Sequence, residues 1–278
     1  ILGMFNTWFF LGGIPDLHTI NEQTDYPKGL KIFTQYILIP LVIVYVLILY
    51  AYGGKILFTW EWPEGWVSKL VLGFSITGTL SLLLVHPIKD LIENKWIHTV
   101  SKWFYSVLIP LDAMLLLAIG RRINDYGITV SRYIVLILGL WLTGITLYFV
   151  LSKSKSIKVV PASLCVIAFL ASFGPWGAFQ VSENNQISRL ESYFQKNNMF
   201  VNNKITKDHG EVSFEDSKEI SSIIRYLNET HGFGGIQQWF DIDLDTLGKN
   251  SGDTIYYTYR YQRPQHLASH TAAKVSAV

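Results

Sequence analysis

Two long stretches of the chain carry no charged residue, and they constrain the fold more than any other feature. Phe33–Tyr52 and Tyr133–Ser152 each run for 20 residues without Asp, Glu, Lys or Arg. A helix of about 20 apolar residues crosses the roughly 30 Å hydrocarbon core of a bilayer. Both runs are continuously apolar, without the alternation of a barrel strand. The sequence therefore predicts membrane-spanning α-helices.

Further apolar runs extend this pattern. Three of them, Trp66–Pro87, Trp103–Gly120 and Val159–Phe179, have the length of a span, and Ile1–Pro15 is expected to be the end of a span whose start is missing. Only 16% of the residues are charged and 50% are hydrophobic, which does not fit an ordinary soluble chain of 278 residues. The predicted fold class is an all-α membrane helical bundle with five complete spans plus one partial span, from a chain expected to be a fragment.

The charges become denser after the last apolar run, which predicts two domains. Residues 1–181 are expected to form the transmembrane helical bundle, and residues 182–278 a small soluble C-terminal α+β domain. Thr254–Tyr261 is aromatic and β-prone and is predicted to be a strand. The tail from Gln262 shows no periodicity, which is typical of disordered chain.

Helix signals are clear in the first half of this predicted domain. Ser182 resembles a helix cap, and Ser213 followed by Asp216 resembles a capping box. Gly232 is expected to end the second helix. Two apolar stripes are predicted to face a core: Ile187, Leu190 and Phe194, then Ile220, Ile223, Ile224 and Leu227.

The segment Arg121–Arg132, with the sequence RRINDYGITVSR, is the first candidate site. Arg121 and Arg122 end one apolar run, Gly127 is the expected left-handed residue of a turn, and Thr129 is the expected N-cap of the next helix. One interpretation is an interfacial helical hairpin with snorkelling arginines. The other is an anion site in which Arg121, Arg122, Tyr126 and Arg132 bind a phosphate or carboxylate.

The sequence also resembles a known family at several spaced motifs. They are Arg122-Ile123, Tyr126-Gly127-Ile128-Thr129, Arg132-Tyr133, Tyr36-Ile37-Leu38-Ile39-Pro40, Trp62-Pro63-Glu64-Gly65-Trp66, Gly174-Pro175-Trp176 and Arg189-Leu190. The family is the bacterial membrane-protein family catalogued as domain of unknown function 4153. The resemblance implies a multi-pass inner-membrane protein with a soluble C-terminal region and a longer parent chain. It brings no activity and no catalytic residues.

Asp112 is the second candidate site because it lies inside a predicted span. A carboxylate near the middle of a span costs about 2.5–3.5 kcal/mol on insertion scales, so it is expected to face protein or water. Pro110 removes a backbone donor and is expected to interrupt the helix, as in the midplane ion sites of transporters. The alternative is a hydrogen-bonded aspartate packed inside the bundle.

Other sites of known chemistry are not indicated. No zinc spacing, nucleophile elbow or phosphate-binding loop is found in the sequence, and Asp241, Asp243 and Asp245 lack the glycine and glutamate of a calcium loop. We expect no catalytic residue, no metal and no cofactor. The net charge of +2 favours no nucleic-acid partner. The expected partners are membrane lipids and a protein that binds the C-terminal domain.

Loop charges suggest an orientation in the bacterial inner membrane. Loops on one side carry eight basic residues and those on the other side seven, so the positive-inside rule places the C-terminal domain and the arginine turn outside the cytoplasm. The predicted function is a scaffold or sensor with a soluble partner-binding domain. The alternative is a secondary transporter with a midplane acid and an interfacial anion site, and a membrane-embedded enzyme fits least.

Overall fold

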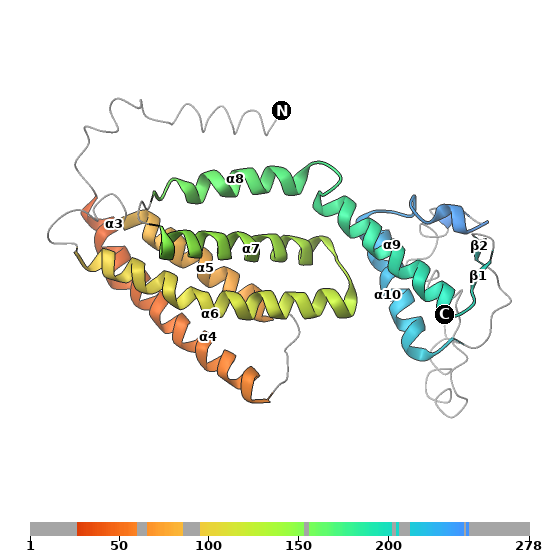
Figure 1. Cartoon of the computed structure of the whole chain (residues 1–278), viewed down its shortest axis with the longest axis horizontal. Helices are drawn as coiled ribbons and strands as arrows, with labels where there is room; N and C mark the ends of the chain where they lie inside the picture. Colours follow the sequence, from red (N-terminus) through yellow and green to blue (C-terminus); the bar gives the residue numbers. More distant parts are fainter. Residues whose placement is uncertain are drawn as a thin grey trace, which may run out of the picture. The chain divides into compact units, whose positions relative to one another are not determined.

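The computed structural model describes residues 27–59, 66–85, 95–152, 156–201, 204–205, 212–241 and 243–244. Most of them are helical, as Figure 1 shows. The helices are α3 (Lys28–Phe33), the π-helix η1 (Thr34–Leu38), α4 (Ile39–Thr59), α5 (Trp66–Val85), α6 (Lys95–Tyr126), α7 (Val130–Leu151), α8 (Val159–Ser172), α9 (Ala178–Lys196), α10 (Phe214–Thr230) and the 3-10 helix η4 (Gln237–Trp239). Strands β1 (Phe200–Val201) and β2 (Lys204–Ile205) pair in antiparallel fashion.

Three described helical stretches are long and apolar enough to cross a membrane. They are Lys28–Ile56, Thr99–Tyr126 and Val130–Leu151, which contain three of the predicted spans. Two apolar helices are shorter: Lys69–Leu84 within α5, and α8. The run Val159–Phe179 was expected to be one helix, but α8 ends at Ser172 and α9 begins at Ala178. The predicted partial span Ile1–Pro15 and the last two residues of the predicted span Trp66–Pro87 lie outside the described residues.

Prolines affect the two long helices differently. A proline ring clashes with the carbonyl four residues earlier in an α-helix. Before Pro40 the helix widens into the five-residue π-helix η1. A π-helix hydrogen-bonds residues five apart instead of four apart, which changes the distance between the proline ring and the carbonyl four residues earlier. At Pro110, however, α6 continues as α-helix on both sides, so the expected interruption beside Asp112 is wrong. The Tyr50 hydroxyl donates to the Val107 carbonyl at 2.9 Å, one turn before this proline.

By their contacts the residues form two compact units, each described by itself. The first extends to Ala118 and includes Leu138–Ala162, and the second comprises Ile119–Ile137 and the chain from Ser163 onward. The turn between α6 and α7 therefore belongs with α9 and α10 in its contacts. The predicted domain boundary between residues 181 and 182 stays a prediction.

Aromatic rings connect the helices of the first unit. Adjacent rings lie 4.5 to 6.0 Å apart between centroids, in the order Tyr45, Phe74, Phe104, Tyr105, Phe149 and Tyr148, so that the series passes from α4 through α5 and α6 to α7. Gly78 makes room for it, because a Cβ there would lie 2.1 Å from the Phe104 ring. Small residues at helix contacts are typical of membrane bundles.

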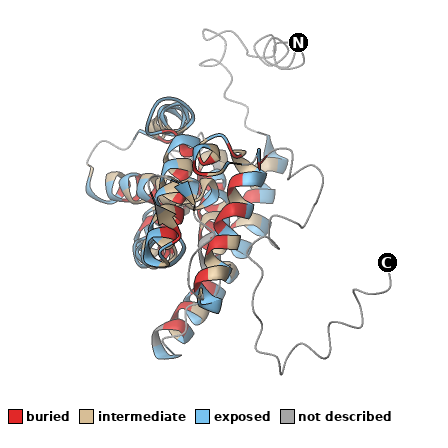
Figure 2. Cartoon of the chain, turned by 90° about the vertical axis from the view of Figure 1, so that its right-hand side faces the viewer, coloured by how far each residue is buried: buried red, intermediate tan, exposed pale blue. Residues whose placement is uncertain are grey.

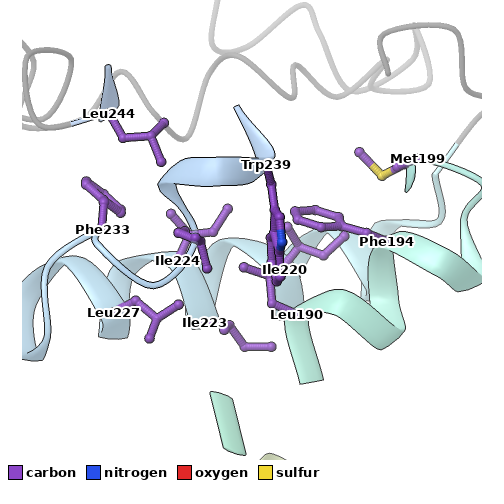
Figure 3. Packing of buried hydrophobic residues seen from close by; sticks show 11 residues of the cluster. Leu190, Phe194, Met199, Ile220, Ile223, Ile224, Leu227, Phe233, Trp239 and Leu244 are labelled. Carbon is purple, nitrogen blue, oxygen red and sulfur yellow. The ribbon is translucent and has the colours of Figure 1, made fainter. Parts of the chain in front are cut away.

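The second unit has a compact hydrophobic core, and both predicted apolar stripes contribute to it. Figure 3 shows Leu190 and Phe194 of α9 facing α10, with Trp239 placed between the two helices. In Figure 2 the buried residues form stripes along the helices rather than covering them. The remaining members are Met199, Ile220, Ile223, Ile224, Leu227, Phe233, Ile236 and Leu244.

The predicted ends of α10 are confirmed. Ser213 is the N-cap and its hydroxyl accepts from the Asp216 amide at 3.1 Å. Gly232 has a φ of +76° and its amide donates to the Leu227 carbonyl. Ser182, by contrast, does not cap α9, because this helix begins at Ala178 and Ser182 lies inside it. The predicted strand Thr254–Tyr261 and the tail from Gln262 lie outside the described residues.

Candidate functional site

The arginine-rich segment forms a tight turn between two helices. α6 ends at Tyr126 and α7 begins at Val130. Gly127 has a φ of +72°, in the left-handed region that glycine tolerates best. The Thr129 hydroxyl accepts from the Arg132 amide at 3.4 Å. Both local predictions, the left-handed glycine and the threonine cap, are therefore confirmed.

The carbonyls at the end of α6 receive their hydrogen bonds from side chains. The last carbonyls of a helix have no partner within it, and leaving them unbonded is unfavourable. Arg132 donates from one amino group to the carbonyls of Tyr126 at 3.0 Å and Gly127 at 2.8 Å. Arg189 donates to the Asp125 carbonyl at 3.1 Å. The α6 terminus is thus closed by guanidinium groups from α7 and α9.

Side chains of α9 and α10 satisfy the rest of the turn. The Gln186 amide group donates to the carbonyls of Tyr126 at 3.3 Å and Ile128 at 3.0 Å. The Asn185 side-chain oxygen accepts from the Ile128 amide at 2.7 Å. The Tyr226 hydroxyl accepts from the Val130 amide at 2.8 Å. We call these contacts the junction, defined as Asn185, Gln186, Arg189 and Tyr226 bound to the backbone of residues 125–130.

Gly127 allows α9 to approach the turn. It is buried, and a Cβ at this position would lie 2.4 Å from Cδ of Arg189, 2.7 Å from Oδ1 of Asn185 and 2.8 Å from Nε2 of Gln186. A side chain here would therefore collide with all three donors and acceptors that α9 presents. The glycine is required twice, for its backbone conformation and for this contact.

The four predicted ligand-binding residues of the turn have different surroundings. Arg121 is exposed and forms a long ion pair of 3.9 Å with Asp125. Arg122 is half-buried and has no hydrogen-bond or ion-pair partner among the described residues. Arg132 is half-buried and its Cζ lies 5.4 Å from the ring centroid of Tyr126, which is exposed. The structure thus brings Tyr126 and Arg132 together and turns Arg121 toward Asp125.

Sequence reasoning missed the α9 and α10 side of this site. Arg189 forms an ion pair of 3.6 Å with Glu219, and its Nε is buried without a hydrogen-bond partner. One signal could have found Gln186: it lies four residues before Leu190 and eight before Phe194, on the stripe that faces the core. A buried amide on an apolar stripe needs hydrogen-bond partners, which here are the turn carbonyls.

A histidine lies beside the start of α9. The Ser182 hydroxyl and Nε2 of His231 are 2.9 Å apart, and the same hydroxyl donates to the Phe179 carbonyl at 3.0 Å. The His231 ring packs edge-on against Phe179 and Tyr226. Ser182 is fully buried, and because its hydroxyl donates to a carbonyl it is able to accept from the imidazole.

Asp112 lies within the first unit and is 2% exposed. Its Oδ2 is 2.5 Å from the Thr143 hydroxyl of α7, and that hydroxyl also lies 3.0 Å from the Gly139 carbonyl. Oδ1 of Asp112 and the hydroxyl of Thr146 are buried and have no hydrogen-bond partner among the described residues. Asp112 and Arg122 are ten residues apart on one continuous helix, or about 15 Å along its axis. The predicted residues therefore form two separate sites.

Metal chemistry finds no support in the described part of the chain. No group of three His, Cys, Asp or Glu side chains is placed there to hold an ion. Asp241 pairs with Lys204 across the segment after α10, and Asp245 lies outside the described residues. The expectation of no cofactor stays a prediction.

The apolar helices indicate a helical membrane protein as the class. Comparison with known proteins then places the chain more closely: residues 1–200 match the model of the family described as "Domain of unknown function (DUF4153)", and the chain belongs to this family. It is also similar to "Uncharacterized protein PM1469" of Pasteurella multocida (strain Pm70), with 26% identity over 203 residues. That match covers 72% of the chain and 34% of the relative, so the chain spans about a third of the relative's length. No solved structure matches the chain.

Proposed function

We propose that the protein is a multi-pass protein of the bacterial inner membrane that acts as a scaffold or sensor, with the α9–α10 unit as its partner-binding part. The junction carries this proposal. It ties four side chains of α9 and α10 to backbone groups of four residues within the segment 125–130, between two apolar helices. A change in the α6–α7 hairpin would have to move α9, and a partner bound to α10 would act on the hairpin by the same contacts.

The junction also bears on how often the chain crosses the membrane. α7 leads away from the turn across one membrane thickness, yet α9 hydrogen-bonds to that turn. We therefore propose that the chain crosses back between Leu151 and Ala178, where α8 is the apolar helix described. Its 14 residues rise about 21 Å, less than the roughly 30 Å of hydrocarbon. Local thinning of the bilayer and the apolar residues after Ser172 make up this difference.

Cys165, the single cysteine of the chain, tests this crossing. It is exposed on the surface of α8, so in a crossing helix it faces hydrocarbon. A membrane-impermeant maleimide should then fail to label it in intact cells and in open membranes, and should label it after denaturation in detergent. Labelling in open membranes before denaturation would place α8 in water and contradict the crossing.

The same reagent tests the side of the membrane. We propose that α9 and α10 lie outside the cytoplasm, from the loop charges. Ser222 of α10 is exposed, whereas Ser217 is half-buried and less suitable for labelling. In a Cys165→Ser background, Ser222→Cys should react on intact spheroplasts. Reaction only after lysis would reverse the orientation.

A partner of α10 can be sought at its exposed first residue. Phe214 is 68% exposed, so a partner bound to this end of α10 can reach its side chain. A photo-crosslinking phenylalanine analogue at position 214 should give a discrete protein adduct in living cells, while the same analogue at Phe169 of α8 should react with lipid. An adduct that changes in Gln186→Leu supports a sensor, and an unchanged adduct supports a scaffold. Equal products at both positions would contradict partner binding.

A secondary transporter is the second candidate, and the buried Asp112 favours it. Two buried oxygens without partners, on facing helices of one bundle, could receive a small polar ligand. The enclosure of Asp112 argues against open access from water, because only 2% of it is exposed. Proteoliposomes that show ion-dependent uptake abolished by Asp112→Asn and retained in Ser106→Ala would establish transport and displace the scaffold.

A further inference from the structure

Two guanidinium groups at the turn lack a carboxylate partner among the described residues. The other two are neutralised: Arg121 by Asp125 at 3.9 Å, and Arg189 by Glu219 at 3.6 Å. Arg132 is held by backbone carbonyls, which satisfy hydrogen bonds but carry no full charge. Arg122 has no partner of either kind in the described part of the chain. The local charge is therefore positive by two.

Three positively charged side chains lie at the same turn. Arg132 and Arg189 donate to carbonyls of three consecutive residues, 125–127, and Arg122 lies one helical turn before Tyr126. The positive charges of Arg122 and Arg189 both repel that of Arg132. Like charges fixed near one another in a half-buried site are unfavourable unless an anion lies between them.

We propose that Arg122 and Arg132 bind the phosphate group of an anionic membrane lipid. Arg132 uses one amino group for the turn, so its Nε and second amino group remain available, and the whole fork of Arg122 is available. Two planar forks can each donate two hydrogen bonds to one phosphate. The turn joins two helices of membrane-spanning length, which places it at the depth of the lipid headgroups.

Tyr126 adds a second element of the site. Its ring is exposed and lies against the Arg132 guanidinium, with 5.4 Å from Cζ to the centroid. This contact orients the Arg132 fork, and tyrosine is favoured at the boundary between headgroups and hydrocarbon. The site thus has two cationic forks and one amphipathic ring. It does not depend on whether α10 binds a partner.

Neighbouring arginines provide a matched test. The purified full chain is incubated with equal amounts of phosphatidylglycerol and phosphatidylcholine, and bound lipid is measured by native mass spectrometry. Wild type should retain phosphatidylglycerol selectively, and Arg122→Ala should bind it about tenfold more weakly, because two charge-assisted hydrogen bonds are lost. Arg121→Ala removes the same charge one residue away and should retain wild-type binding. Equal losses in the two variants would show a general surface field and overturn the proposal.

Two further measurements are needed. One distinguishes a lipid phosphate from a soluble phosphate, and the other distinguishes a binding role of Arg122 from a purely structural role. Inorganic phosphate should not displace the lipid; displacement at low concentration, without selectivity among lipids, would identify a soluble phosphate and overturn the lipid assignment. In lipid-free detergent Arg122→Ala should raise the melting temperature, because it relieves repulsion with Arg132. A lower melting temperature would assign Arg122 to the fold and overturn the site. Arg122→Lys should recover part of the binding, since an ammonium group lacks the fork.

Discussion

The α4–α7 bundle and the α9–α10 unit are held together in different ways. In the bundle, ring contacts connect the helices, glycines admit large side chains, and few hydrogen bonds cross from helix to helix among the described residues. In the α9–α10 unit, a core of eleven buried apolar residues stabilises the helices, and polar side chains satisfy the turn. Apolar burial drives folding in water, whereas helices in lipid associate through shape.

The difference shows where each region is sensitive. The bundle contains the buried Asp112, which has one carboxylate oxygen without a hydrogen-bond partner among the described residues. Its helices are otherwise connected by several aromatic ring contacts, so no single contact dominates. The junction concentrates its hydrogen bonds on four backbone residues of one turn, and its close approach depends on the single glycine in that turn. Changes at the junction should therefore have large effects, and polar changes within the bundle small ones. The following predictions test this contrast, starting with the largest.

Gly127→Ala should destabilise the α9–α10 unit by about 2–4 kcal/mol. The strained left-handed backbone accounts for about 1–2 kcal/mol, and the collision with Arg189 and Asn185 for the rest. Hydrogen exchange should accelerate in α9 and α10 and stay unchanged in α4. Gly120→Ala is the control, because no atom lies within 4 Å of its added Cβ, and it should be neutral or slightly stabilising. Similar exchange in the two variants would contradict the junction.

Gln186→Leu should cost about 1–3 kcal/mol. It leaves the carbonyls of Tyr126 and Ile128 without this donor in a site where the side chain is only 2% exposed. Gln180→Leu, on the same helix but exposed, should change stability by less than about 0.5 kcal/mol. Thermal unfolding followed by α9-specific hydrogen exchange measures both. If Gln186→Leu leaves the stability unchanged, water replaces the hydrogen bonds that the glutamine side chain donated.

Acid should weaken the α9–α10 unit through Asp216. Hydrogen bonds from Lys196 at 2.8 Å and Asn197 at 3.2 Å hold the pKa of this carboxyl below its ordinary value. Its stabilisation is therefore complete above the ordinary pKa of about 4 and is lost as the pH falls through the lower, folded-state pKa. Wild type should lose melting temperature below about pH 4 more steeply than Asp216→Asn. Parallel curves of melting temperature against pH for the two proteins would show that the Lys196–Asp216 pair does not cause the loss of stability in acid.

Lys196 gives the corresponding alkaline limit. The hydrogen bond to Asp216 raises the pKa of the Lys196 ammonium, so its contribution is present below the ordinary value and disappears as the pH rises through the raised one. Because Lys196 is exposed, the change should be small and should weaken with added salt.

Asp112→Asn should have the smallest effect, within about 1 kcal/mol. The asparagine side chain has the same shape and keeps a hydrogen bond to Thr143, and it cannot carry a charge inside the bundle. The melting temperature of the purified variant measures this. A loss of several degrees that Thr143→Val reproduces would show that Asp112 is an ionised structural partner, and the bundle would then be as sensitive as the junction.

Local features of the fold were predictable because they depend on neighbouring residues. The left-handed Gly127, the Thr129 cap, the Ser213 N-cap and the face of α10 follow from backbone sterics and periodicity, and all are confirmed. The end of α8 was not predictable from hydropathy, since Phe173 to Phe179 are as apolar as the helix before them. Gly174, with a φ of +89°, turns the chain there.

The candidate site was predictable only on one side. Composition and spacing identified the arginines of the turn, but not that Arg132 would bind carbonyls or that Arg121 would pair with Asp125. The missing partners, Asn185 and Tyr226, are 57 and 96 residues away from the backbone atoms they bind. Contacts at such separation leave no periodic signal in a single sequence.

This separation also orders events during synthesis. A ribosome adds about 5–20 residues per second, so Val130 waits at least several seconds for Tyr226 to be made. Until then the Val130 amide of the turn lacks the Tyr226 hydroxyl that accepts its hydrogen bond. The turn is therefore completed late, by a helix that follows both α6 and α7 in the chain. A chain that ends before α10 leaves this hydrogen bond of the turn unmade.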